Sequence, residues 1–320
     1  MSHPGGLTRE HVIWAYRLLL DRDPENEDVI GPKLAGSRDT SELRHHLMTS
    51  AEFQRKNLDY AHTNDRTVVI KEIALPRGGT IRLFIDLSDH VIGLNILRGR
   101  YEEDEIRFVH SVLKPGDTAI DAGAHIGFFT AHMAAAVGPS GKVYAFEPLD
   151  ANAELAERSI RENGFEGRVV FDRAAVGPSS GSATLTFPVE TLNSGGAYLL
   201  RPGTAPLAGN LTNSVSQVAL DDLNLHQLAR AVRLIKMDVE GAEPLVIRGA
   251  VRLLKTAKPL ILSEIHPTQL DRASGVTPDR FLAELDALGY NAHAIEKGEV
   301  GARLERAPAE VLMSVVFVAR

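Results

Sequence analysis

Residues 114–148 constrain this chain more than any other stretch, because patterns typical of strand, turn and helix follow one another there. They read KPGDTAIDAGAHIGFFTAHMAAAVGPSGKVYAFEP. Apolar runs at 118–120 and 142–146 predict two buried strands, and residues 126–137 suit a helix that ends at Gly138. Two strands joined by a crossover helix form a βαβ unit. The stretch therefore predicts a parallel, doubly wound α/β sheet, whose ligands bind beyond the carboxyl ends of the strands.

The turn after the first of these strands predicts a nucleoside site. Asp121 ends the strand, and Gly123, Ala124 and Gly127 follow it. Small residues let a ligand approach the backbone. Glu147, at the end of the second strand, can accept two hydrogen bonds from the vicinal hydroxyls of a ribose. A dinucleotide fingerprint would read GxGxxG, so the GxxxG spacing of this turn is a poor match to an NAD site.

A second group of polar side chains follows two later strands. Residues 234–243 read LIKMDVEGAE, and residues 259–265 are a predicted fifth strand. The strand at 234–235 is the fourth along the chain, and we expect it beside the glycine-turn strand. The ends of these two strands carry four predicted catalytic side chains: Asp238, Glu240, Glu264 and His266. Such groups also bind Mg²⁺ or Mn²⁺, so a metal ion at this edge is an open alternative.

The composition disfavours several classes of protein. The chain has 320 residues, a net charge of −7 and no long basic tract, which argues against a nucleic-acid-binding surface. It has no cysteine, and hence no disulfide, thiolate metal site or cysteine nucleophile. We find no apolar leader and no run of 18 apolar residues, and so expect a cytoplasmic protein without a transmembrane segment.

The periodicity of the apolar residues divides the chain into three parts. We expect residues 1–60 to form a helical domain, with Trp14 in its core and one face marked by Val12, Ile13, Tyr16, Leu19 and Leu20. Residues 61–100 predict a β-hairpin that connects this domain to the next. Residues 101–320 contain the predicted doubly wound sheet.

Two segments outside the strand ends are also predicted to reach the ligand. Glu102 precedes a predicted helix at 105–113 that should pack beside the glycine turn, which lets this residue overhang the cofactor. Residues 191–213 are rich in glycine, proline, asparagine and serine, and they predict a lid or acceptor-binding loop with Asn193 and Ser194 near the ligand.

Several separate motifs resemble the FkbM family of S-adenosylmethionine-dependent methyltransferases. They are GDTAIDAGAHIGFFT, VYAFEP, LIKMDVEGAEPLVIRGA and ILSEIHP, in this order. The resemblance implies a class I methyltransferase (Rossmann-like) domain over residues 101–320, with a seven-stranded sheet whose last strand is antiparallel. It also implies S-adenosylmethionine as cofactor and a hydroxyl acceptor on a sugar, glycan or glycosylated natural product. The position usually held by an acid near the adenine is not acidic here, so we expect backbone contacts at Ala174 and Ala175.

Methyl transfer to an alcohol requires a base, because a protonated alcohol is a poor nucleophile. His266 is the first candidate, and Asp238 is the second or orients the acceptor. Glu240 and Glu264 would hydrogen-bond acceptor hydroxyls or hold the amino group of the cofactor. The predicted cofactor contacts are Asp121, Gly123, Ala124, Gly127, Glu147, Ala174, Ala175, Asp238 and Glu102.

Two other functions remain open at this stage. A nicotinamide-dependent oxidoreductase is disfavoured by the missing third glycine, and a non-catalytic nucleoside-binding protein is disfavoured by the acidic strand ends. The segments YRLLLDRDP (16–24) and SAEF (50–53) resemble a helical, linker-like domain attached to bacterial glycan-related enzymes. We therefore expect the N-terminal helices to contact a protein partner or a second copy of the chain.

Overall fold

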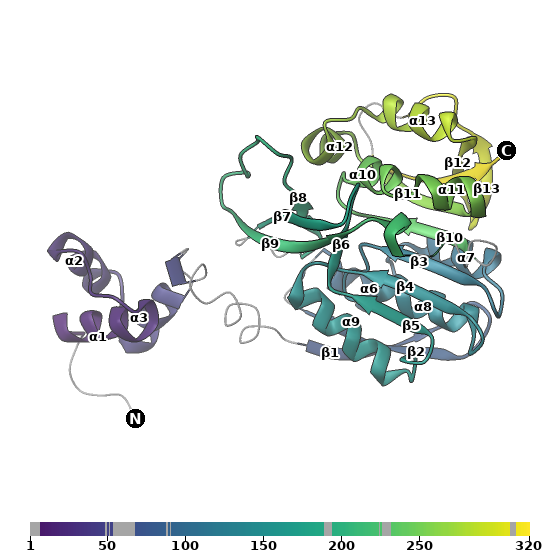
Figure 1. The fold of residues 1–320 in the computed structure, drawn as a ribbon. Helices are drawn as coiled ribbons and strands as arrows, with labels where there is room; N and C mark the ends of the chain where they lie inside the picture. The colour runs from purple at the N-terminus through teal and green to yellow at the C-terminus, as the bar shows by residue number, and fades with distance from the viewer. Residues whose placement is uncertain are drawn as a thin grey trace. The chain divides into compact units, whose positions relative to one another are not determined.

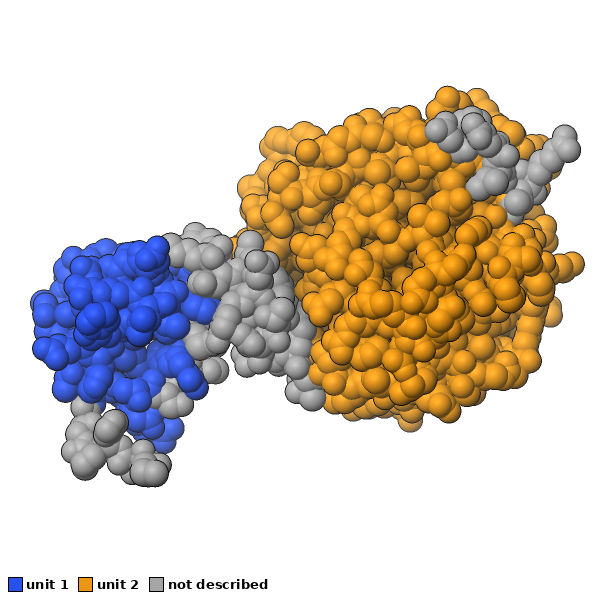
Figure 2. All heavy atoms as spheres, turned by 60° about the horizontal axis from the view of Figure 1, so that its bottom comes forward, with its two compact units in different colours: residues 1–66 blue, residues 67–320 orange. Residues whose placement is uncertain are grey.

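The structure, a computed structural model, describes residues 7–48, 50, 52–53, 68–87, 89, 91–188, 194–223, 225, 232–307 and 312–320. The chain forms two compact units, residues 1–66 and residues 67–320 (Figure 2). Within the described part of the chain, no helix combines the length and the apolar character needed to cross a membrane.

The first unit is helical, with α1 (Arg9–Leu20), α2 (Glu27–Ala35) and α3 (Thr40–Met48). Val12, Tyr16 and Leu20 recur at helical spacing on α1 and are buried in a small core of their own. Trp14 is 58% exposed, so the prediction that it lies in this core is wrong. It stands two residues from both Val12 and Tyr16 and so points away from their side of the helix.

The second unit is built on an eight-stranded sheet (Figure 1). From one edge to the other, its order is β5-β4-β3-β10-β11-β14-β12-β13. The strands are β3 (Thr118–Ala122), β4 (Lys142–Phe146), β5 (Val169–Asp172), β10 (Val232–Met237), β11 (Leu260–Ile265), β12 (Tyr290–Glu296), β13 (Glu299–Arg303) and β14 (Met313–Ala319). The first five strands in this order pair in parallel, and β14 is antiparallel to both of its neighbours.

This arrangement confirms the predicted class I, Rossmann-like sheet, with β14 as its antiparallel last strand. Strand β10, the fourth of the predicted strands along the chain, pairs with the glycine-turn strand β3, as predicted. The edge strand β13 was not predicted. It pairs with β12 through a tight turn at Lys297 and Gly298, both at positive φ.

Both faces of the sheet are covered by helices, which explains why its central strands are mostly apolar (Figure 1). Neighbouring strand residues alternate between two cores: Ala119 lies in one and Ile120 in the other. One core includes α7 (Glu103–Val112), α8 (Phe128–Val137) and α9 (Asp150–Glu162). The other includes α10 (Glu243–Arg248), α11 (Val251–Ala257), α12 (Pro267–Ser274) and α13 (Pro278–Ala287).

A hairpin of β1 (Val68–Ala74) and β2 (Thr80–Asp86) packs on the outside of α9 and is followed by α6 (Gly93–Leu97). Ile81, Leu83 and Ile85 alternate along β2 and are buried in the first of the two cores. The hydroxyl of Ser159 accepts a hydrogen bond from the backbone N–H of Phe84 at 3.0 Å. The hairpin therefore belongs to the unit that contains the large sheet.

A second, smaller sheet is formed by strands within residues 174–218. Along the chain, these strands follow β5 and precede β10. The strands of this sheet are β6 (Ala174–Val176), β7 (Gly181–Pro188), β8 (Tyr198–Leu199) and β9 (Asn210–Val218), in the order β6-β9-β7-β8. Part of the predicted lid at 191–213 is thus a set of paired strands. Asn193 lies outside the described residues, and Ser194 begins a short 3₁₀ turn, Ser194–Gly196.

Candidate active site

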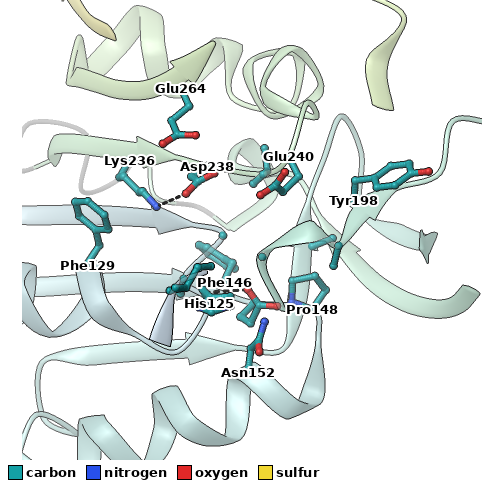
Figure 3. A pocket seen from close by; sticks show the side chains of 18 of the residues that line it. His125, Phe129, Phe146, Pro148, Asn152, Tyr198, Lys236, Asp238, Glu240 and Glu264 are labelled. Carbon is teal, nitrogen blue, oxygen red and sulfur yellow. Dashed lines mark hydrogen bonds and ion pairs between the residues drawn. The ribbon is translucent and has the colours of Figure 1, made fainter. Parts of the chain in front are cut away.

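A cavity of about 330 Å³ lies beyond the carboxyl ends of β3, β4 and β10 (Figure 3). Residues 174–176, 195 and 197–199 supply part of its wall from the smaller sheet. Most of the predicted site residues line this cavity: Glu102, Gly123, Ala124, Glu147, Ala174, Ala175, Asp238, Glu240 and Glu264. Asp121, Gly127 and His266 were predicted at the site but do not line it.

The glycine turn is fixed by the neighbouring strands. The backbone N–H groups of Gly123 and Ala124 both donate to the carbonyl of Phe146, at 3.0 and 2.8 Å. Gly123 has φ +84°, and a Cβ atom placed on it would lie 1.9 Å from the carbonyl oxygen of Asp238. The chain itself therefore requires glycine at this position, in addition to any ligand that approaches the turn.

Glu147 ties the turn to the end of β4. Its Oε2 accepts a hydrogen bond from the N–H of His125 and its Oε1 from that of Leu149, both at 2.9 Å. Burial raises the pKa of Glu147 to about 7, although these two bonds favour the charged form. Each oxygen keeps a second lone pair for a ligand hydroxyl, which fits the ribose contact predicted for this residue.

Asp121 lies inside the protein, and its side chain does not reach the cavity. Its Oδ2 accepts a hydrogen bond from the Thr130 hydroxyl at 2.6 Å, and its Oδ1 has no hydrogen-bond partner among the described residues. Burial raises the pKa of Asp121 to about 6. Its side chain therefore supports the turn from within, whereas a direct cofactor contact was expected.

Three carboxyl groups lie close together in the wall of the cavity. One oxygen each from Glu102, Asp238 and Glu264 lie within 4.8 Å of one another. Glu102 precedes α7, Asp238 follows β10 and Glu264 lies in β11, so segments distant in the sequence supply them. Figure 3 shows Asp238 and Glu264 directed toward the same space. The predicted acidic edge is thus a compact cluster.

Sequence reasoning missed a lysine within this cluster. The Nζ atom of Lys236 lies 3.0 Å from Oδ2 of Asp238, and the lysine side chain is only 7% exposed (Figure 3). The available signal was a charged residue between two apolar residues of a strand, Ile235 and Met237. Lysine is almost never buried unless it is paired, so this pattern points to buried carboxylates nearby.

The carboxyl groups of the cavity differ in their environments. Repulsion from Asp238, followed by burial, raises the pKa of Glu264 to about 9. Burial raises the pKa of Glu240 to about 9 and that of Glu102 to about 7. The site therefore favours the protonated forms of Glu240 and Glu264, whereas Asp238 is paired with an ammonium group.

Three residues of the cavity wall have a left-handed backbone although they are not glycines. Their φ angles are 44° at Glu102, 51° at His125 and 54° at Glu240. This conformation costs on the order of 1–3 kcal/mol per residue and is found mostly at functional sites. The strain supports the cavity as the site at which the protein acts.

His266 is not brought together with Asp238 and Glu264 in this cavity, contrary to expectation. Strand β11 ends at Ile265, so His266 is already the N-cap of α12, and its carbonyl accepts the N–H of Leu270 at 3.0 Å. Its Nδ1 is buried without a hydrogen-bond partner among the described residues.

The acidic cluster is a poor fit to a resident divalent cation. The spacing of its three carboxylates would suit a metal ion. However, the Lys236 ammonium already occupies Asp238 Oδ2, and a dication on the same carboxylate would face a buried like charge. We derive no step of the reaction from a metal.

The sheet order and the cavity at its carboxyl edge define a class I methyltransferase. Residues 121–292 match the family model described as the methyltransferase FkbM domain. The chain is 30% identical over 228 residues to 31-O-demethyl-FK506 methyltransferase FkbM of Streptomyces tacrolimicus, covering 62% of this chain and 82% of that protein. It therefore belongs to the FkbM family of S-adenosylmethionine-dependent methyltransferases.

Two solved structures are similar at lower identity. Methyltransferase FkbM from Methylobacillus flagellatus KT is 15% identical, with a TM-score of 0.39, over 96% of this chain and 58% of that one. Fibrillarin from Aeropyrum pernix, solved with natively bound S-adenosyl-L-methionine, is 12% identical, with a TM-score of 0.38, over 80% of this chain and 96% of that one.

Proposed function

We propose that this protein transfers the methyl group of S-adenosylmethionine to a hydroxyl group of a sugar, a glycan or a glycosylated natural product. The name of the Streptomyces relative describes methylation at an oxygen, which supports oxygen as the acceptor atom here. The observation that carries the proposal is the Asp238 carboxylate, which lies in the cavity beside a buried cation and two further carboxyl groups.

Asp238 is the base in this proposal. As the acceptor oxygen attacks the methyl carbon in line, the carbon–oxygen bond forms and the carbon–sulfur bond breaks, leaving S-adenosylhomocysteine. The hydroxyl proton passes to the Asp238 carboxylate and from there to water. Holding the two reactants in line contributes up to about 7–11 kcal/mol to lowering the barrier. His266 gives way to Asp238 in this role because its side chain does not line the cavity.

The other cavity residues divide between cofactor and acceptor. Glu147 takes the ribose hydroxyls, and the backbone at Ala174 and Ala175 flanks the adenine. Glu240 and Glu264, protonated near pH 7, donate hydrogen bonds to acceptor oxygens. An acceptor with several hydroxyl groups satisfies such a row of carboxyl groups better than a simple alcohol does, which favours a sugar.

The proposal is tested in two stages with the full-length protein. Calorimetric titration with S-adenosylhomocysteine and, separately, with NAD distinguishes a methyltransferase from an oxidoreductase; we expect binding of the former alone. Transfer of tritiated methyl from S-adenosylmethionine is then measured to phenyl glycosides, simple alcohols, amines and carboxylic acids. Methylation of a glycoside hydroxyl is the expected result. Transfer to nitrogen or to a carboxylate would overturn oxygen as the acceptor atom, and binding without transfer to any acceptor would favour a non-catalytic protein.

A further inference from the structure

Lys236 occupies a position where a lysine is unusual. It lies in the centre of the sheet, in β10, and its residue is 5% exposed. Its Nζ is 3.0 Å from Oδ2 of Asp238 and 4.3 Å from the centre of the Phe129 ring. Both the carboxylate and the face of the aromatic ring attract a cation, so they fix the ammonium at the floor of the cavity.

Among the described residues, the titratable groups that most influence this ammonium are carboxyl groups, and they come from several elements around it. They are Asp121 of β3, Glu102 before α7, Asp238 after β10, and, beside Asp238, Glu240 and Glu264. Burial alone would lower the pKa of Lys236, but the attraction of Asp238, Asp121 and Glu102 outweighs it and raises the pKa above its ordinary value. Lys236 is therefore a permanent positive charge in the site.

The carboxyl groups differ in how they contact the Lys236 ammonium. Among the described residues, only Asp238 forms a hydrogen bond with the ammonium, through Oδ2. Its other oxygen, Oδ1, has no hydrogen-bond donor in the described part of the chain and remains for an acceptor hydroxyl. Glu102, Glu240 and Glu264 are partly buried near Asp238 without such a bond, and their pKa values are raised.

We propose that Lys236 is a positioning residue for methyl transfer: its ammonium holds the Asp238 carboxylate through Oδ2 and leaves Oδ1 for the acceptor hydroxyl. This inference rests on the proposed function. Without the lysine, Asp238 has no cation at hydrogen-bond distance among the described residues and keeps the carboxyl groups of Glu102 and Glu264 as close neighbours. The expected consequence is slower methyl transfer.

The direct test is carbon NMR of protein labelled at the aspartate carboxyl carbon. The Asp238 signal is assigned by its absence in Asp238→Asn, and it is followed over pH in the wild type, in Lys236→Met and in Lys236→Arg. Loss of a cation at hydrogen-bond distance moves such a titration by about one pH unit or more. We expect protonation of Asp238 at a higher pH in Lys236→Met and a return toward wild type in Lys236→Arg. Lys142→Met, an exposed lysine at the start of β4, is the matched control.

Kinetics supply the second readout. With any acceptor that the wild type methylates, Lys236→Met should lower kcat by at least about tenfold and shift the acid limb of the pH profile upward, while affinity for S-adenosylhomocysteine changes by less than about threefold. If Lys236→Met does not fold, Lys236→Gln replaces it, because it keeps a donor without the charge. Identical titration of Asp238 in the wild type and the uncharged variant would overturn the inference. That result does not depend on an acceptor, whereas absence of methyl transfer by the wild type would refute the proposed function itself.

Discussion

The carbonyl oxygen of Asp238 stands 1.9 Å from the point that a Cβ atom on Gly123 would occupy. The same backbone is joined to the neighbouring strand by a hydrogen bond from the N–H of Asp238 to the carbonyl of Ala122, at 3.1 Å. The turn predicted to hold the cofactor and the residue proposed as the base are therefore in direct backbone contact. A change in one moves the other.

Gly123→Ala should therefore lower the stability of the protein by more than the positive φ angle at this position alone would. A side chain at a position with positive φ lowers the stability of the folded protein by about 1–2 kcal/mol. The overpacking against Asp238 lowers it further, by about 1–3 kcal/mol. We expect lower thermal stability together with loss of S-adenosylhomocysteine binding, measured by thermal unfolding and calorimetry. Gly116→Ala is the control, since Gly116 has φ +94° but its Cβ would meet only the Ser140 hydroxyl, at 3.7 Å. Equal effects of the two substitutions would contradict the backbone clash.

Asp238→Asn should lower kcat by about 10²–10⁴, the usual contribution of a general base. The asparagine keeps the size of the side chain but cannot take the hydroxyl proton, so binding of S-adenosylhomocysteine should change little. His266→Ala should leave kcat within about threefold of wild type, because the histidine side chain does not line the cavity. Steady-state methyl transfer measures both variants. The reverse pattern would return the role of base to His266.

Glu264→Gln should make stability less dependent on pH. The pKa of Glu264 in the folded protein is raised to about 9, above its ordinary value, so between pH 5 and 8 the unfolded chain releases this proton and the folded protein keeps it. Its contribution to stability is complete at low pH and is lost as the pH rises toward 9. Glutamine imitates the protonated acid, so the variant should match wild type at pH 5 and unfold at a temperature on the order of 10 °C higher at pH 8.

The exposed Glu299 of β13 supplies the control for this experiment. Glu299→Gln should leave the pH dependence of the unfolding temperature as it is in wild type. A Glu264→Gln curve parallel to that of wild type would mean that Glu264 is already ionised in the folded protein at neutral pH.

A fragment of residues 67–320 should bind S-adenosylhomocysteine with the affinity of the full chain, within about twofold. Every residue that lines the cavity belongs to this unit, beginning with Val91. Calorimetry measures the affinity, and circular dichroism checks that the fragment is folded. A folded fragment that does not bind would assign residues 1–66 a part in the site. The prediction that these residues contact a partner is separate from this experiment.

The central sheet and most of the cavity could be predicted from the sequence because their signals are local. Each parallel strand is a short apolar run, and the residues that line the cavity from β3 and β4, such as Gly123 and Glu147, directly follow such a run. Once the order of the strands is assumed, their ends must meet at one edge. This reasoning places Asp238, Glu240 and Glu264 correctly without any knowledge of their contacts.

The features that were missed depend on contacts between distant segments or on a single residue position. His266 lies one residue beyond the end of β11, and the sequence pattern does not fix a strand end to that accuracy. Lys236 could have been noticed as a charge inside an apolar strand, but the sequence pattern does not show that Asp238 lies 3.0 Å from its ammonium. The smaller sheet pairs β6 with β9 across about 40 residues, and a local sequence pattern does not show which strands pair over such a separation.

One side of the cavity is formed by the smaller sheet, whose strands are paired independently of the large sheet. Its hairpin strands β7 and β9 are held by their own ladder, from Gly181 opposite Gln217 to Pro188 opposite Asn210, and Leu185, Tyr198 and Leu199 face the cavity from it. Gly123, Glu147 and Asp238 follow strands of the large sheet instead. Two separately paired sheets thus contribute to one cavity, so a substitution in the wall from the smaller sheet need not disturb the hydrogen bonds of the glycine turn.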